Sequence, residues 1–307
     1  MYPLEHVYSL GAYEVWRKKE KGDRLDDVDL KDFRQSSQQI ATDRFWDVRS
    51  WDDLRTAVSF LTLMNKRDVL YFRGQRAHFD SCLPVLFREE WSCNKHRFRL
   101  SPRNRGKYYA LLRELRGDVL RVARQVGMPR TYILEHVPAA AASVLQHYEL
   151  WPTHFIDVTR SLPTAVAFAE GVGDQEHAYL YVFAMPDLRG SITSDIDEHL
   201  TLSRLEAVCP PDAKRPHHQD AYLVSRFPEP PGMAGPGDAS WDDWQAKTDL
   251  MRRVVAKFLL RLQDGRLLGA PRVESSFLIP SFNEDVFGRR LHEALLPTVK
   301  RHAAKLA

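Results

Sequence analysis

The sequence predicts an α+β fold, in which helices surround a sheet and the two kinds of element do not alternate regularly. Short apolar runs such as HAYLYVFAMP and DAYLVSRF are typical of strands, whereas WDDLRTAVSFLTLM repeats its apolar residues with the period of a helix. The order of these runs lacks the βαβ repetition of a doubly wound parallel sheet. With 307 residues, of which 44% are hydrophobic and 28% charged, the chain can build a sizeable core.

The first 49 residues are polar and only weakly periodic. We expect residues 1–49 to form an N-terminal arm or short helices packed on a main domain, residues 50–300. At the start of that domain, Ser50 followed by Asp53 resembles a capping box, so a helix is predicted to begin directly after Ser50. The short strand DVLYFRG follows this helix and is expected to end at Gly74.

A basic segment covers residues 94–130, where only Glu114 and Asp118 carry negative charge. An apolar stripe with helical spacing runs through it, which indicates a folded helix and not a disordered tail. A second helix is predicted over 131–146, and we interpret 94–146 as a basic helical insertion in the main domain. The basic residues of the segment are Lys95, Arg97, Arg99, Arg103, Arg105, Lys107, Arg113, Arg116, Arg121, Arg124 and Arg130.

The second half of the chain mixes both kinds of element. HFIDVT is predicted to be a buried strand. A turn follows it, and then a short helix that starts near Pro163 and ends at Gly171. HAYLYVFAMP and DAYLVSRF are predicted strands, and the PEPPGMAGPG run is a loop. After it, we expect a long amphipathic helix over 241–264, a strand at VESSFLIP and a terminal helix at NEDVFGRRLHEALLPTV.

The net charge of +3 is too small to indicate a nucleic-acid or membrane partner by itself. The three cysteines, Cys82, Cys93 and Cys209, are irregularly spaced, which argues against a disulfide framework and favours a reducing cytoplasm. The chain has no apolar run of about 20 residues and its first residues do not resemble a secretory leader. We therefore expect a soluble cytoplasmic protein without a membrane partner.

Motifs for metal ions and for common nucleotide folds are missing. Neither His217 and His218 nor the group of Cys82, Cys93 and His96 has the C-x-x-C or H-E-x-x-H spacing of a metal site, so no metal is expected. The sequence also lacks a Walker loop, a G-x-G-x-x-G fingerprint and a G-x-S-x-G elbow. A bound dinucleotide would therefore not lie in a Rossmann fold.

An arginine and a glycine stand at the end of the predicted strand YFRGQ. Arginine is a planar fork of donors that holds phosphate or carboxylate groups, and glycine permits close approach to the main chain. Arg73 and Gly74 are therefore candidates for an anion site. The alternative is structural, with Arg73 paired to a carboxylate and Gly74 turning the chain.

YFRGQ, LQHY, HFIDVTRSLPTAVAFA and SFLIPSFNEDV occur in this order between Trp51 and Pro297. Together they resemble the FRG domain family, and through it the ADP-ribosyltransferases of the arginine-serine-glutamate type. The resemblance implies a split β-sheet core with surrounding helices, and NAD as the bound dinucleotide. It also implies an arginine-glycine pair on one strand, a hydroxyl-rich strand followed by a helix, and an acidic residue that opens a later strand.

Carried over to this chain, the resemblance gives five residues a cofactor-binding role. Arg73 would contact the phosphates or the nicotinamide ribose of NAD, the main chain of Gly74 would bond the nicotinamide amide, and Gln75 completes the motif. Thr159 and Ser161 fall in the hydroxyl motif. Their alternative role is structural, since Ser161 is placed to cap the helix that follows it.

The catalytic carboxylate is where this chain departs from the transferase pattern. HHQDAYLV offers Gln219 or Asp220 in place of the glutamate, and FRG-type sequences tend to carry glutamine there. Either Asp220 stabilises the cationic sugar, or Asp157 does so from the neighbouring strand, or the site binds a nucleotide without catalysis. His147 in LQHY is a candidate base, with a buried histidine bonded to the main chain as the alternative.

The sequence therefore predicts an NAD-dependent mono-ADP-ribosyltransferase or NAD glycohydrolase. Its target would be nucleic acid or protein, contacted through the basic segment 94–130, although such charge runs are also typical of solvated faces. One alternative is a non-catalytic nucleotide or nucleic-acid binding module with a degenerate transferase fold. Another is a nuclease that uses Asp157, Asp220 and a histidine around a divalent ion.

Overall fold

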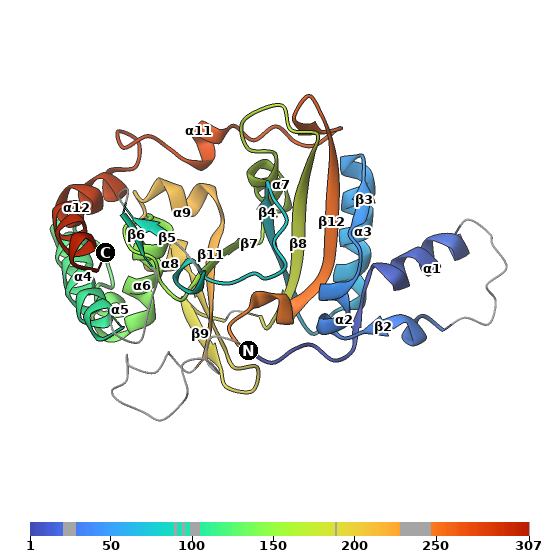
Figure 1. The fold of residues 1–307 in the computed structure, drawn as a ribbon, viewed down its shortest axis with the longest axis horizontal. Coiled ribbons are helices and arrows are strands. Elements are labelled where there is room, and N and C mark those ends of the chain that lie inside the picture. Colours follow the sequence, from blue (N-terminus) through green and yellow to red (C-terminus); the bar gives the residue numbers. More distant parts are fainter. Residues whose placement is uncertain are drawn as a thin grey trace.

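A mixed β-sheet forms the centre of the molecule in the computed structural model, which describes residues 1–20, 29–88, 91–93, 96–98, 105–187, 189–227 and 247–306. Within these residues the sheet has nine strands in the order β13-β12-β8-β4-β7-β11-β10-β9, and β3 lies beside β12 (Figure 1). The strands are β3 (Trp46–Val48), β4 (Val69–Gln75), β7 (Ile156–Thr159), β8 (His177–Met185), β9 (Ile192–Asp195), β10 (Leu200–Arg204), β11 (Ala221–Arg226), β12 (Val254–Gln263) and β13 (Arg266–Leu267).

Neighbouring strands of this sheet are antiparallel, except for the parallel pair of β3 and β12. Two small sheets join β1 (Val7–Tyr8) to β2 (Arg34–Gln35) and β5 (Trp91–Cys93) to β6 (His96–Phe98). The described α-helices are α1 (Leu10–Glu20), α2 (Ser37–Thr42), α3 (Trp51–Met64), α4 (Arg105–Gln125), α5 (Tyr132–His136), α6 (Pro138–His147), α7 (Leu162–Glu170), α8 (Leu205–Val208), α9 (Lys214–His218), α11 (Ser275–Leu278) and α12 (Val286–Leu306). The predicted α+β class is confirmed.

Several predicted elements are present where the sequence pattern placed them. The helix after Ser50 is α3, and the Ser50 hydroxyl accepts a hydrogen bond from the Asp53 main-chain N–H at 3.2 Å. YFRGQ lies in β4, the IDVT of HFIDVT forms β7, HAYLYVFAM forms β8 and AYLVSR forms β11. The basic helix is α4 and the terminal helix is α12. Lys95, Arg99 and Arg103 of the basic segment lie outside the described residues.

The predicted helix over 241–264 is wrong in its described part. A short 3₁₀ turn, Leu250–Arg253, leads into β12, whereas residues 241–246 lie outside the described residues. The first residues of β12 are buried on both faces. β8 and β3 pair with the edges of β12, and α2 is packed against it. A strand buried on both faces shows no alternation of polar and apolar residues, so its sequence is easily taken for a helix.

Two further predictions need correction. VESSFLIP was expected to be a strand, but its described structure is the short helix α11, which has no neighbouring strand and leaves Phe277 and Ile279 exposed. The single helix predicted over 131–146 is divided into α5 and α6. The division falls at Val137 because Pro138, the first residue of α6, lacks the N–H that would continue α5.

The side chains form two hydrophobic cores. One core lies around β4, β8 and β12 and includes residues of the N-terminal part, among them Val7, Leu10 and Tyr13. The other lies among α4, α5, α6, α8 and α12, which gather at one end of the molecule in Figure 1. In α12 its members repeat every four residues, from Phe287 through Leu291, which places them on one face of the helix.

The two cores meet at β11, where Tyr222 and Val224 belong to the first core and Ala221 and Leu223 to the second. The candidate site lies close by, between β4 and β7. β4 pairs with β8 along its whole length, from Val69 with Met185 to Gln75 with Tyr179. By contrast, β4 and β7 share a single residue pair, Phe72 with Thr159. Beyond that pair the two strands no longer exchange main-chain hydrogen bonds, and this opening positions the candidate site.

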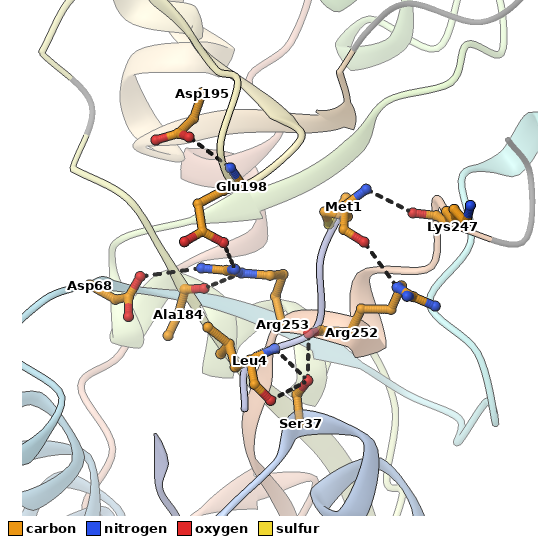
Figure 2. Close-up of polar contacts among 10 residues, drawn as sticks. All are labelled: Met1, Leu4, Ser37, Asp68, Ala184, Asp195, Glu198, Lys247, Arg252 and Arg253. Atoms are coloured by element: carbon orange, nitrogen blue, oxygen red, sulfur yellow. Dashed lines mark hydrogen bonds and ion pairs between the residues drawn. The ribbon is translucent and has the colours of Figure 1, made fainter. Parts of the chain in front are cut away.

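Arg253 links the loops that hold Asp68 and Glu198 to the end of β8 (Figure 2). The guanidinium group is fully buried. Its Nε donates to the Ala184 carbonyl at 2.9 Å, Nη1 lies 2.6 Å from Glu198 Oε2 and Nη2 lies 3.2 Å from Asp68 Oδ1. Burial raises the pKa of Asp68, and the Arg253 charge offsets part of that rise. Each of these four groups therefore depends on the others for its stability in a low-dielectric environment.

Candidate functional site

A cavity of about 480 Å³ lies at the opening between β4 and β7. Its walls come from β4, β7, α6, α7, α9 and the first residue of β11. The volume falls within the range of small-molecule sites, roughly 300–1,000 Å³. Of the nine candidate residues, seven line the cavity, namely Arg73, Gly74, Gln75, His147, Asp157, Thr159 and Gln219. Ser161 and Asp220 do not line it.

Arg73 faces the cavity from β4 and is not paired with a carboxylate side chain in the described residues. Its Nη1 donates a hydrogen bond of 2.5 Å to the main-chain carbonyl of Asp157, across the gap where β4 and β7 no longer pair. Its Nε is buried and has no hydrogen-bond partner within the described part of the chain. The guanidinium is thus anchored at one end and keeps donors for a ligand.

The structure explains why position 74 holds a glycine, and the explanation differs from the one that the sequence suggested. A Cβ at this position would lie 1.8 Å from the Ala165 carbonyl oxygen and 2.7 Å from the Ala169 nitrogen, both in the main chain of α7. Gly74 is therefore needed because α7 packs directly on β4. Its main chain still borders the cavity, as does Gln75, but close approach of a ligand is not required to explain the glycine.

His147 and Asp157 form a pair at the wall of the cavity. His147 ends α6 with only 2% of its side chain exposed, and its Nδ1 lies 3.1 Å from Asp157 Oδ1. Burial lowers the pKa of His147, and the hydrogen bond to Asp157 offsets only part of this effect. The imidazole is therefore neutral at pH 7.

Asp157 is ionised beside this neutral imidazole. Burial favours its neutral form, but the His147 hydrogen bond and the charges of Arg73 and Arg215 outweigh burial and hold the pKa of Asp157 below its usual value. An ionised carboxylate only accepts hydrogen bonds, so we assign the imidazole proton to Nδ1 of His147. His147 Nε2 then has a free lone pair, and within the described residues this buried atom has no partner. About 40% of the Asp157 side chain remains exposed, on the cavity side.

Gln219 lies at the end of α9, opposite β7. Its side chain is buried, and its Nε2 donates a hydrogen bond of 2.7 Å to the Leu278 carbonyl in α11. Its main-chain carbonyl accepts a hydrogen bond from the Thr159 hydroxyl at 2.8 Å. Gln219 is therefore held from two sides at the cavity wall.

The two predicted hydroxyl residues serve the local main chain. Thr159 Oγ1 donates to Gln219 and accepts from the Ser161 N–H at 3.0 Å. Ser161 Oγ accepts hydrogen bonds from the Thr164 N–H at 3.3 Å and from the Thr164 hydroxyl at 2.8 Å, which makes it the N-cap of α7. For Ser161 the structural interpretation holds, because the only described contacts of its hydroxyl are with Thr164 in the first turn of the helix.

Asp220 lies apart from the cavity, close to Tyr222, Arg160 and Arg204. Burial raises the pKa of Asp220, and the two arginines and the Tyr222 hydroxyl offset part of that rise. Asp157 and Asp220 therefore do not gather around one ion, as the nuclease hypothesis requires. Among the described residues no three His, Cys, Asp or Glu side chains form a group that could hold a metal.

Arg215 is a cavity residue that the sequence analysis missed. It lies in α9, four residues before Gln219, so the helical period puts both on one face. Its side chain is 19% exposed, its Nη2 lies 2.6 Å from Glu149 Oε1, and within the described residues its buried Nε has no partner. The spacing of Arg215 and Gln219 was the available signal, but it required knowing that KRPHH is a helix.

Positive charge exceeds negative charge around the cavity. Arg73, Arg76 and Arg215 line it, against the carboxylates of Glu149 and Asp157, and one of these carboxylates is already bound to Arg215. The remaining walls include the rings of Phe79 and Phe168, and Phe79 is half exposed. The arrangement suits a ligand that combines a flat ring with an anionic group.

Comparison of the chain with models of known protein families, with curated proteins and with solved structures finds no match in any of the three. None of the helices in the described residues is both long and apolar enough to cross a bilayer. Any statement about function therefore depends on the geometry of the cavity itself.

Proposed function

We propose that the cavity binds NAD and breaks its nicotinamide–ribose bond, which would make the chain an NAD-dependent mono-ADP-ribosyltransferase or NAD glycohydrolase. The observation that carries this proposal is the convergence of Arg73, His147, Asp157 and Gln219 on one cavity from four separate segments. The opening between β4 and β7 is in keeping with the split sheet that the resemblance to ADP-ribosyltransferases implies.

Two arginines would hold the diphosphate of NAD. Arg73 reaches the cavity from β4 and Arg215 from α9. Guanidinium groups bind phosphate oxygens in a bidentate manner, and a low-dielectric wall strengthens that interaction. Phe79 and Phe168 would offer apolar faces to the adenine or nicotinamide ring.

Asp157 would supply the negative charge that the reaction needs. When the bond between ribose C1′ and the nicotinamide nitrogen breaks, its electron pair leaves with nicotinamide and positive charge develops on the sugar. The low pKa of Asp157 keeps this carboxylate ionised at neutral pH, so it can stabilise that charge. Gln219, in the place of the transferase glutamate, would orient the substrate by hydrogen bonds.

His147 would take the proton of the acceptor. The lone pair of its Nε2 can accept the proton of a hydroxyl group or water as the acceptor oxygen forms its new bond to C1′. The ionised Asp157 favours this transfer, because it stabilises the imidazolium that results. The same pair of residues would thus serve bond breaking and bond formation.

The test is release of nicotinamide from labelled NAD, with Asp157→Asn compared against Asp220→Asn. The two substitutions remove the same charge, one inside the cavity and one outside it. We expect Asp157→Asn to slow release by about a hundredfold or more, because the charge next to the developing cation is lost. Asp220→Asn should remain within about threefold of the unmodified protein. Equal loss in both variants would contradict the assignment of Asp157.

A second candidate function, a non-catalytic nucleotide-binding module, is favoured by one observation. Gln219 stands where the transferases have their catalytic glutamate, and its side-chain amide donates a hydrogen bond to the Leu278 carbonyl. Titration calorimetry can test whether ADP-ribose binds and whether Arg73→Ala lowers the affinity. If both are found but nicotinamide is never released from NAD, this second function replaces the first. Absence of both binding and release would reject both functions.

A further inference from the structure

The helices α4 and α12 hold a large share of the positive charge of the chain. The sequence of α4 has six basic and two acidic residues, a net charge of +4. The sequence of α12 has five basic residues and one acidic residue, also a net of +4. Since the whole chain carries only +3, the remainder of the protein is acidic, and the charge is strongly polarised.

The fold places these two helices together although about 160 residues separate them in sequence. They are packed against each other at one end of the molecule (Figure 1). Their apolar faces enter the same core, with Leu111, Leu115 and Val119 from α4 and Leu291 and Leu295 from α12. Their opposite faces therefore lie next to each other on the surface.

Several cations on these outer faces are available to a partner. Lys107 and Arg113 in α4, and Arg290 and Lys300 in α12, are exposed, and no described carboxylate forms an ion pair with them. Other cations are partly neutralised, since Arg121 pairs with Asp118 in the same helix. An array of unpaired cations on the surface attracts polyanions from a distance.

The chemistry of this face favours the backbone of duplex nucleic acid. α4 has 21 residues and is about 31 Å long, close to the length of one duplex turn, about 34 Å. Recognition of single strands requires aromatic side chains on which bases stack. None of the exposed large apolar side chains found in the described residues belongs to α4 or α12. Within the described residues, α4 and α12 therefore offer cations for phosphates but no exposed aromatic side chain of their own on which an unpaired base could stack.

We infer that the joint outer face of α4 and α12 is a binding surface for duplex nucleic acid, independent of sequence. The inference goes beyond the proposed function of the cavity and does not depend on it, because binding requires neither NAD nor Asp157. If the cavity does transfer ADP-ribose, this surface would bring nucleic acid to it as the acceptor.

The experiment is fluorescence anisotropy with a labelled duplex of about 20 base pairs, as DNA and as RNA, in about 50 to 200 mM KCl and without NAD. We expect log K to fall with log salt with a slope of about −4, as four phosphate contacts would give. Arg113→Gln combined with Lys300→Gln should weaken binding at least about tenfold at the lowest salt and reduce the slope by about 2.

The control removes two exposed cations elsewhere, Arg44→Gln with Lys66→Gln, and should bind like the unmodified protein. Asp157→Asn should also bind normally, so that failure of the cavity and failure of this surface can be told apart. Equal weakening in the Arg44 and Lys66 control would show that only net charge matters and would overturn the inference. Competition by polyglutamate at the same charge concentration would also overturn the inference, because it would identify an acidic protein as the better partner. Tighter binding of single strands than of the duplex would overturn it as well.

Discussion

At the scale of single residues, burial decides which charges are structural. In the described residues two basic side chains are buried, Arg253 and Lys257. Lys257 donates to the Ala41 carbonyl at 2.7 Å and lies over the ring of Phe45. Burial lowers the pKa of Lys257, whereas Arg253 contacts two carboxylates and donates to a carbonyl. Both side chains stabilise contacts between segments far apart in sequence.

Arg253 provides the first prediction. Arg253→Met should lower the free energy of unfolding by about 3 kcal/mol or more, since Asp68 and Glu198 lose the cation that offsets their desolvation. The matched control is Arg261→Met, which removes a pair with Asp47 whose side chains are 47% and 50% exposed. That change should cost less than about 1 kcal/mol. Urea unfolding measures both, and equal losses would mean that burial does not set the contribution of the pair.

Because of His154, we expect the free energy of unfolding to fall in acid. It is almost completely buried, and burial lowers its pKa to about 3. The pKa of an unfolded histidine is about 6.5, so below that pH the unfolded chain binds a proton that the folded chain does not. Stability should therefore fall by up to about 1.4 kcal/mol per pH unit between pH 6.5 and 3.

The measurement is urea unfolding of the unmodified protein and of His154→Phe at pH 7 and at mildly acidic pH. His154→Phe removes the proton uptake on unfolding, so its stability should depend less steeply on pH, whatever its stability at pH 7. An unchanged pH dependence would show that His154 is already protonated in the folded state or contributes nothing to the transition.

At the scale of elements, two glycines have opposite roles. Gly74 in β4 leaves no room for a side chain, because the main chain of α7 touches it. Gly117 lies inside α4, and a Cβ there would meet nothing within 4 Å. The first glycine is required by packing, whereas packing gives no reason for the second.

The two glycine-to-alanine substitutions should therefore differ in sign. Gly117→Ala should stabilise the protein by about 0.5–1 kcal/mol, because alanine has the higher helix propensity. Gly74→Ala should destabilise it by about 3 kcal/mol or more, because α7 must move away from β4. Thermal and urea unfolding can measure both. A stable Gly74→Ala protein with an unchanged cavity would contradict the close packing described here.

At the scale of the whole molecule, the cavity lies close to where the two cores meet. Arg73 and Gln75 belong to the sheet around β8 and β12, whereas His147 and Arg215 belong to the helices around the second core. A ligand held by both sets of residues would link β4 to these helices beside the place where β4 and β7 share a single residue pair.

Ligand binding should therefore stabilise the whole chain. ADP-ribose or NAD at a hundredfold excess over Kd should raise the free energy of unfolding by about 2.7 kcal/mol and raise Tm accordingly. The shift should shrink in Arg73→Ala and remain in Asp220→Asn. A Tm that does not respond to either nucleotide would remove the basis for a nucleotide site in this cavity.

Much of the candidate site could be predicted from sequence because its residues occupy the ends of short, well-marked elements. Arg73 closes an apolar run, Asp157 lies within another, and Gln219 lies two residues before β11, so hydrophobic periodicity and the turn residues locate them. Arg215 was missed because nothing local marks its helix. The strand β12 was mistaken for a helix because its burial on both faces comes from partners distant in sequence.

The sequence by itself determined the α+β class, the positions of β4, β7, β8 and β11 and of α3, α4, α7 and α12, and which polar residues stand at strand ends. The reason is that periodicity, caps and turn residues act over a few neighbouring positions. Only the tertiary structure decided that Gly74 serves helix packing, that Asp157 and not Asp220 faces the cavity, and that α4 and α12 share one basic face. Those facts depend on contacts between residues tens to hundreds of positions apart, whose geometry no local pattern specifies.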